Sequence, residues 1–136
     1  MGVADARPFR VLIVEDTADR QDVLKSLYKN QAWVMVHTGR RALKLLEAYE
    51  FDIVSLDYNL ADELTGADVA AALRPHVAAG GRVVVHSQNP RGVARIREIL
   101  PDAIAYPVAK MARSNLRMRR LRAGVDAEGP RYDFSA

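Results

Sequence analysis

The amino-acid sequence predicts one α/β domain, a doubly wound parallel sheet of the (βα)5 type with the strand order 2-1-3-4-5. Short apolar runs alternate with helical patterns five times along the 136 residues, and this length suits a single domain. The runs show little polar alternation, which is typical of parallel strands covered by helices on both faces. Right-handed crossovers around a central first strand favour this order.

Each predicted strand is a short run that is rich in branched and apolar residues. The first strand runs into Glu15 and Asp16, the third ends at Asp57, and Ser87 ends the fourth. The five ranges are 9–14, 33–37, 51–57, 82–86 and 103–106. Ligands bind beyond the carboxyl ends of such strands, where the strand order reverses, so these end residues are the first candidates for a functional site.

Each predicted helix combines a start or stop signal with apolar residues at helical spacing. Thr38 is an N-cap, and Asn89 followed by Pro90 opens the fourth helix. The pair Gly80–Gly81 stops the third helix, which Pro75 can bend. The five ranges are 17–30, 38–49, 65–79, 90–100 and 108–122.

The folded domain is expected to span residues 9–122, between a flexible segment over 1–8 and a disordered tail over 123–136 that shows no sustained pattern. No apolar run approaches the roughly 20 residues of a membrane span, and the start lacks the apolar core of a secretion signal. We therefore expect a cytoplasmic protein that does not bind membranes. The absence of cysteine excludes disulfides, thiol catalysis and thiolate metal sites.

The net formal charge of +3 is modest, and much of the positive excess lies near the C-terminus. A basic helix can contact nucleic acid, acidic partners or only water. We favour a solvated face and expect no nucleic-acid partner. The basic residues of this segment are Lys110, Arg113, Arg117, Arg119, Arg120 and Arg122.

The predicted strand order places Glu15 and Asp16 beside Asp57. Three carboxylates at adjacent strand ends repel one another unless a cation lies among them, and an oxygen cluster of this size suits Mg²⁺. Ser87 adds a hydroxyl from the neighbouring strand. The set fits phosphoryl chemistry, with Asp57 as nucleophile and Mg²⁺ neutralising the phosphoryl oxygens. The structural alternative is that Asp16 only caps a helix and Ser87 is a turn residue.

The run Val-Leu-Ile-Val-Glu-Asp at 11–16, followed by Asp57 and Ser87, resembles the receiver domain of two-component response regulators over about residues 9–122. The resemblance implies a flavodoxin-like fold in which Asp57 accepts phosphate from a histidine kinase, a phosphotransfer protein or a small phosphodonor. It also implies that Glu15, Asp16, Asp57 and the backbone carbonyl of Asn59 hold Mg²⁺, and that Ser87 fills the switch position. Such a stand-alone receiver would act through a downstream protein or a homodimer.

The end of the fifth strand departs from the receiver pattern. Receivers carry a lysine before a proline there, and the ammonium group holds the phosphoryl oxygens. Counted from Ser87, Ala109 falls on the lysine position and Lys110 one residue later; aligned on the proline, Tyr106 replaces the lysine. A tyrosine supplies no positive charge, so Lys110 is the candidate replacement.

Further motifs resemble the divergent receivers described as cyclic-phosphate-processing. These are Leu-Asp-Tyr-Asn-Leu at 56–60, Thr65-Gly66 with Val69-Ala70, and His-Ser-Gln-Asn at 86–89 with Gly92. The resemblance implies, as an alternative, an enzyme that opens or transfers cyclic phosphates with His86 or Ser87 in support. Strand alternation sends His86 and Ser87 to opposite faces, so with Ser87 facing the acidic crevice we favour packing of His86 under a helix over acid–base catalysis.

Three hypotheses remain open at this point. The first is a phosphoacceptor signalling module, which ranks narrowly first because its central residues are all present. The second is an enzyme that acts on cyclic phosphates. The third is a degenerate interaction domain that never receives phosphate, which the missing lysine favours.

Overall fold

The structure, a computed structural model, describes residues 8–135 and contains one five-stranded sheet in the order β2-β1-β3-β4-β5. All four strand pairs are parallel, so the predicted fold class and strand order are confirmed. The strands are β1 (Arg10–Val14), β2 (Ala32–Val36), β3 (Ile53–Leu56), β4 (Arg82–Val85) and β5 (Ile104–Ala105).

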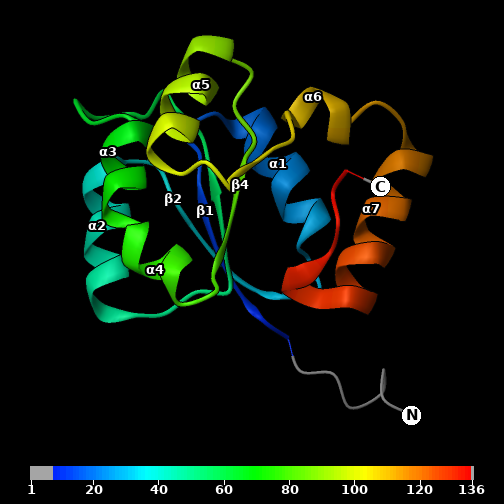
Figure 1. Cartoon of the computed structure of the whole chain (residues 1–136). Coiled ribbons are helices and arrows are strands. Elements are labelled where there is room, and N and C mark those ends of the chain that lie inside the picture. Colours follow the sequence, from blue (N-terminus) through cyan, green and yellow to red (C-terminus); the bar gives the residue numbers. More distant parts are fainter. Residues whose placement is uncertain (1–7, 136) are drawn as a thin grey trace.

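Helices cover both faces of the sheet, with α1 and α7 on one side and α2, α3 and α5 on the other (Figure 1). Their bounds are α1 (Ala18–Leu27), α2 (Gly39–Ala48), α3 (Gly66–Ala72), α4 (Arg74–Ala78), α5 (Pro90–Ile99), α6 (Val108–Met111) and α7 (Asn115–Glu128), followed by the 3-10 helix η2 (Gly129–Arg131). No helix within residues 8–135 is both long enough and apolar enough to cross a membrane.

Alternate residues of the central strands pack into two separate hydrophobic cores, one on each face of the sheet. Leu12 and Val14 of β1 pack with α2, α3 and α5, whereas Val11 and Ile13 pack with α1, α6 and α7. Successive side chains of a strand point to opposite faces, so a strand buried on both faces needs apolar residues throughout. This packing explains why the strands read as unbroken apolar runs in the sequence.

Two of the predicted helices are each divided in two. The third predicted helix breaks at Leu73, and Pro75 lies in the first turn of the new helix α4. Proline fits a first turn but not a helix interior, because it lacks an N–H and its ring clashes with the preceding turn. The last predicted helix breaks after α6, and the Ser114 side chain caps α7 by accepting a hydrogen bond from the Arg117 N–H.

The C-terminal segment, predicted as a disordered tail over residues 123–136, is ordered within the described residues. Helix α7 continues to Glu128, and Phe134 beyond η2 is only 3% exposed. The Phe134 ring makes edge-to-face contacts with Tyr106, at a centroid distance of 5.6 Å, and with Tyr132, at 4.9 Å. Within the described residues this segment therefore packs on the core. The predicted flexible segment over 1–8 lies, except for Pro8, outside the described residues.

We expect Phe134→Ala to lower the free energy of unfolding by about 3 kcal/mol, because it removes a buried ring and leaves a gap beside Tyr106. Phe134→Leu keeps most of the apolar volume and should cost about 1 kcal/mol. Urea denaturation followed by circular dichroism measures both, with the exposed Ser135→Ala as control. Equal stability of Phe134→Ala and the wild type would mean that the tail contributes nothing to the fold.

Candidate functional site

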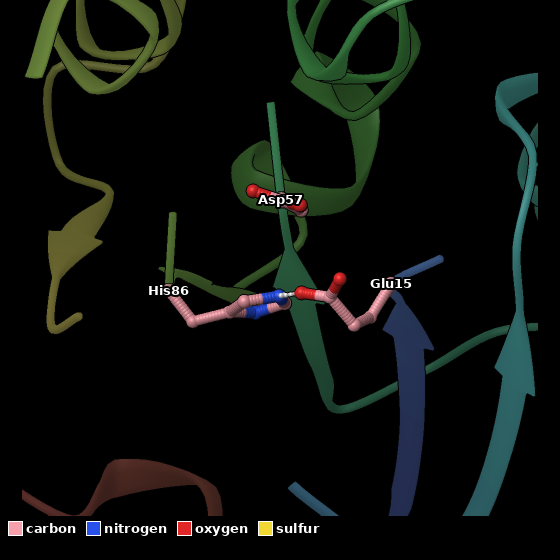
Figure 2. Close-up of side chains that lie close together, drawn as sticks. All are labelled: Glu15, Asp57 and His86. Atoms are coloured by element: carbon pink, nitrogen blue, oxygen red, sulfur yellow. Dashed lines mark hydrogen bonds and ion pairs between the residues drawn. The ribbon is translucent and has the colours of Figure 1, made fainter. Parts of the chain in front are cut away.

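The carboxyl ends of β1, β3 and β4 bring three buried ionisable side chains together. Glu15, Asp57 and His86 each offer a ligand atom within 4.8 Å of the others (Figure 2). The residues before them, Val14, Leu56 and Val85, are aligned with one another in the sheet. Because the strands share this register, the next side chain of each strand points to the same face, which is the face covered by α1.

Glu15 is fully buried, and its carboxylate accepts several hydrogen bonds. Oε1 accepts from His86 Nε2 at 2.9 Å, Oε2 accepts from the Thr17 N–H at 3.0 Å, and Arg20 Nε lies 3.2 Å from both oxygens. Burial acts to raise the pKa of Glu15. The hydrogen bond and the electrostatic interaction with His86, together with the Thr17 and Arg20 donors, outweigh burial and lower the pKa of Glu15 to about 2.

His86 lies between Glu15 and Ser55 and is fully buried. Its Nε2 bonds Glu15 Oε1 (Figure 2), and its Nδ1 lies 2.7 Å from Ser55 Oγ. Both ring nitrogens therefore have partners. His86 is buried as predicted, but the argument that it lies on the face opposite the acidic residues is wrong. That argument assumed that Ser87 faces the carboxylates, whereas the sheet register places His86 on the face of Glu15 and Asp57.

Asp57 keeps one buried oxygen without a hydrogen-bond partner. Its Oδ1 accepts from the Tyr58 N–H at 2.8 Å, whereas Oδ2 has no partner among residues 8–135. Burial and the negative charge of Glu15 raise the pKa of Asp57, against the opposing effects of His86, the Tyr58 N–H and the Ser87 hydroxyl. The Ser87 hydroxyl lowers this pKa from nearby without a hydrogen bond to Oδ2.

Arg20 of α1 completes the cluster, and the sequence analysis missed it. Its Nη2 donates to Thr17 Oγ1 at 2.7 Å and lies 3.7 Å from Asp57 Oδ2. Together with the Nε contacts to Glu15, this places one guanidinium between two buried carboxylates. The cation that the carboxylates need is therefore partly supplied by the chain itself. The sequence feature that could have indicated this contact is a basic residue near the start of the helix that follows Glu15.

Two other predicted site residues lie at the rim. Asp16 is exposed and accepts a hydrogen bond from the Thr17 hydroxyl at 3.3 Å, so it stands apart from the compact buried cluster. Ser87 is buried at the end of β4, and its Oγ accepts from the Asn89 N–H at 3.1 Å. Asn89 caps α5 by accepting from the Gly92 N–H.

The end of β5 holds no cation directed at the carboxylates. Tyr106 is buried there, and Arg117 Nη1 donates to its hydroxyl at 3.4 Å. The Lys110 Nζ lies 4.9 Å from the centre of the Tyr106 ring, a cation–π contact at the surface. Lys110 makes no ion pair with a carboxylate among the described residues. The structure therefore leaves the candidate replacement lysine outside the acidic cluster.

Two glycines of the sequence motifs let helices approach the loop after Asp57. A Cβ on Gly66 would collide with the backbone carbonyl of Asp57, and a Cβ on Gly92 would collide with the Tyr58 ring. The Gly66 N–H donates to the Tyr58 carbonyl at 2.7 Å. The starts of α3 and α5 thus hold the Asp57 loop by contacts that only glycine permits. The exposed Asn59, also in this loop, pairs with Thr65 in an isolated β-bridge.

Two of the predicted metal ligands carry oxygens of the kind that Mg²⁺ binds, and one of them, Asp16, lies outside the buried cluster. Mg²⁺ prefers oxygen ligands and keeps several waters, so Asp57 Oδ2 and the exposed Asp16 carboxylate are suitable ligands. Both oxygens of Glu15 already accept hydrogen bonds. Glu15 would have to give up these bonds to bind a metal, and the carbonyl of Asn59 stays a predicted ligand.

The family model described as a cyclic-phosphate processing receiver domain matches residues 5–102. No protein with a curated description matches the chain.

Solved structures of receiver domains resemble the chain along most of its length. The phosphorylated cyanobacterial phytochrome response regulator RcpA is 21% identical, with a TM-score of 0.63, and the match covers 95% of this chain and 96% of that one. TrrA of Thermotoga maritima, solved with Mg²⁺ and BeF, is 20% identical, with a TM-score of 0.61 and coverage of 83% and 98%. The NarL receiver domain of Mycobacterium tuberculosis is 24% identical, with a TM-score of 0.61 and coverage of 91% and 99%.

These structural likenesses show a receiver fold of the response-regulator type, which agrees with the observed strand order. The family model covers most of the chain and includes Glu15, Asp57 and His86. The chain therefore belongs to the cyclic-phosphate processing receiver domain family.

Proposed function

We propose that this receiver domain accepts a phosphoryl group on Asp57 with the help of Mg²⁺, as one step of a two-component or phosphorelay pathway. The observation that supports this best is the Asp57 Oδ2 atom, a buried carboxylate oxygen without a hydrogen-bond partner among residues 8–135. A buried polar atom without a hydrogen-bond partner costs folding free energy until a ligand binds it. Asp57 lies at the carboxyl end of β3, where ligands of doubly wound sheets bind.

The roles of the other residues follow from their contacts. Asp16 and Asp57 would hold Mg²⁺, which supplies positive charge to the phosphoryl oxygens when it is bound. Ser87 would donate its hydroxyl to one of these oxygens, since it lies close enough to influence the pKa of Asp57. The phosphoryl donor would be a histidine kinase or a phosphotransfer protein, the partners that receiver domains generally have.

The family match favours a second candidate function, the processing of cyclic phosphates. Opening a cyclic phosphate requires a group that manages a proton at the substrate. His86 is fully buried and both of its ring nitrogens are bonded, so it is placed to orient Glu15 rather than to touch a substrate. This geometry ranks the second candidate behind phosphoryl acceptance.

The raised pKa of Asp57 leads to a stability prediction. The ionised carboxylate costs folding free energy once the pH exceeds the ordinary aspartate pKa of 3.8, and the full penalty applies above the raised pKa of Asp57 in the folded state. Without Mg²⁺ at pH 7, Asp57→Asn should therefore raise Tm by roughly 2–8 °C, the shift that about 1 kcal/mol produces in small domains. Millimolar Mg²⁺ should raise the Tm of the wild type and leave that of Asp57→Asn unchanged.

Thermal melts at pH 3 and pH 7 check both parts, with the exposed Asp102→Asn as matched control. The difference between wild type and Asp57→Asn should shrink at the lower pH, where the wild-type carboxyl group is protonated as well. If neither Mg²⁺ nor the Asp57→Asn substitution changes Tm, Asp57 has a purely structural role.

Acetyl phosphate with Mg²⁺ should add one phosphoryl group to the wild-type protein, and Asp57→Ala should remove all labelling. Asp16→Asn should raise the Mg²⁺ concentration needed for half-maximal labelling at least about tenfold, because it removes a charged ligand. Intact-protein mass spectrometry over time measures both effects. If the folded wild type takes up no phosphoryl group under any condition, a domain that acts only by protein interaction becomes the better account.

A panel of 2′,3′-cyclic nucleotides and cyclic-phosphate RNA ends, with and without Mg²⁺, separates the two candidate functions. The buried and fully bonded His86 leads us to expect no ring-opened product by chromatography. Product that disappears in Asp57→Ala and falls in His86→Ala would place cyclic-phosphate processing first.

A further inference from the structure

The proposed phosphoryl transfer needs a cation that the end of β5 does not provide. A phosphoryl group bound to Asp57 carries negative charge on its free oxygens, and fixed positive groups stabilise such charge where it develops. The nearby strand end holds the buried Tyr106, and the Lys110 ammonium lies over the outside of that ring. Neither residue presents positive charge to Asp57.

We infer that Arg20, which reaches the site from α1, is the residue that binds the phosphoryl oxygens on Asp57; this inference rests on the proposed function. The Arg20 Nη2 lies 3.7 Å from Asp57 Oδ2, the oxygen without a hydrogen-bond partner among residues 8–135. That distance is too long for a direct hydrogen bond, yet it places the positive charge of Arg20 beside the carboxylate that would accept the phosphoryl group.

The guanidinium is held in place from one side and is open on the other. Its Nε contacts both oxygens of Glu15 at 3.2 Å, and its Nη2 donates to Thr17 Oγ1 at 2.7 Å. Its Nη1 has no hydrogen-bond partner within residues 8–135, and about a third of the side chain, 32%, is exposed. A guanidinium has five donors in a rigid planar fork, so Arg20 can keep its anchors and still donate to an anion.

Glu15 takes a different role in this arrangement. Its carboxylate accepts hydrogen bonds from Arg20 Nε at 3.2 Å and from His86 Nε2 at 2.9 Å. Because Glu15 holds the Arg20 guanidinium in place, little free energy is needed to reorient this positive charge when a phosphoryl group binds. Glu15 and its partner His86 are therefore positioning residues for Arg20, whereas Asp16 and Asp57 remain the carboxylates for the metal.

The transfer step balances without a proton. An oxygen of the ionised Asp57 forms a bond to the phosphorus of acetyl phosphate, and the bond from phosphorus to the acetyl oxygen breaks. Acetate leaves with the electron pair of that bond, and the dianionic phosphoryl group stays on Asp57. The negative charge at the Asp57 side chain thus increases from one to two, and Arg20 is the protein cation next to that position.

The test compares Arg20→Ala and Arg20→Lys with the wild type, and uses Arg41→Ala on the exposed face of α2 as matched control. The first measurement is the rate of labelling by acetyl phosphate at saturating Mg²⁺, followed by intact mass. The second is the affinity for beryllium fluoride, a non-covalent phosphoryl mimic, followed by fluorine NMR. Circular dichroism first establishes that each variant is folded at the temperature used.

Arg20→Ala should reduce both the labelling rate and the beryllium fluoride affinity about 100-fold, the usual loss for one preorganised donor to a developing charge. Arg20→Lys should recover part of this loss, because charge returns without the planar fork. Arg41→Ala should behave as the wild type.

Labelling of the wild type with no change in folded Arg20→Ala overturns the inference and spares the proposed function. Loss of labelling in Lys110→Ala, with Arg20→Ala unaffected, overturns it as well by assigning the cation to Lys110. A wild type that binds neither acetyl phosphate nor beryllium fluoride overturns the proposed function together with this inference. If Arg20→Ala proves unfolded, the Arg20→Lys protein decides: labelling and beryllium fluoride affinity equal to the wild type would overturn the role of the guanidinium fork.

Discussion

The buried contact between Glu15 and His86 is the constraint on which the site depends. A buried ionised carboxylate is tolerated only when charged or hydrogen-bonding partners replace its lost hydration. His86 Nε2, the Thr17 N–H and Arg20 provide these partners for Glu15. Because Glu15 follows β1 and His86 follows β4, the contact spans the intervening strand β3 and fixes the relative position of three strand ends.

Asp57 follows that intervening strand, and its carboxylate lies beside both Glu15 and Arg20. Glu15 raises the pKa of Asp57 through its negative charge and at the same time holds the Arg20 guanidinium that opposes this charge. The result is a carboxylate with one satisfied oxygen and one unsatisfied oxygen in a buried place. A site of this kind stores free energy that binding of a cation or an anion can release, which is common at functional positions.

The sequence predicts the sheet better than it predicts the site. Strand order follows from unbroken apolar runs and crossover handedness, which are local or general rules, and the structure agrees. The contact of Arg20 with Glu15 crosses a strand-to-helix turn, for which no periodicity exists, and the side of His86 depends on register between strands. Phe134 is a single aromatic residue outside any pattern, so only the tertiary structure reveals its packing on Tyr106.

The packing of Phe134 on Tyr106 also explains how the end of β5 can do without a lysine. A buried tyrosine there contributes apolar area to the core with α6 and α7, and the tail closes over it. An ammonium at the same position would need a carboxylate beside it or remain a buried charge. With Arg20 next to Asp57, the positive charge of the site comes from α1, and the fifth strand end is free to serve packing. The absence of a lysine at the end of β5 and the presence of Arg20 on α1 are thus connected, because the positive charge lies on the helix instead of the strand end.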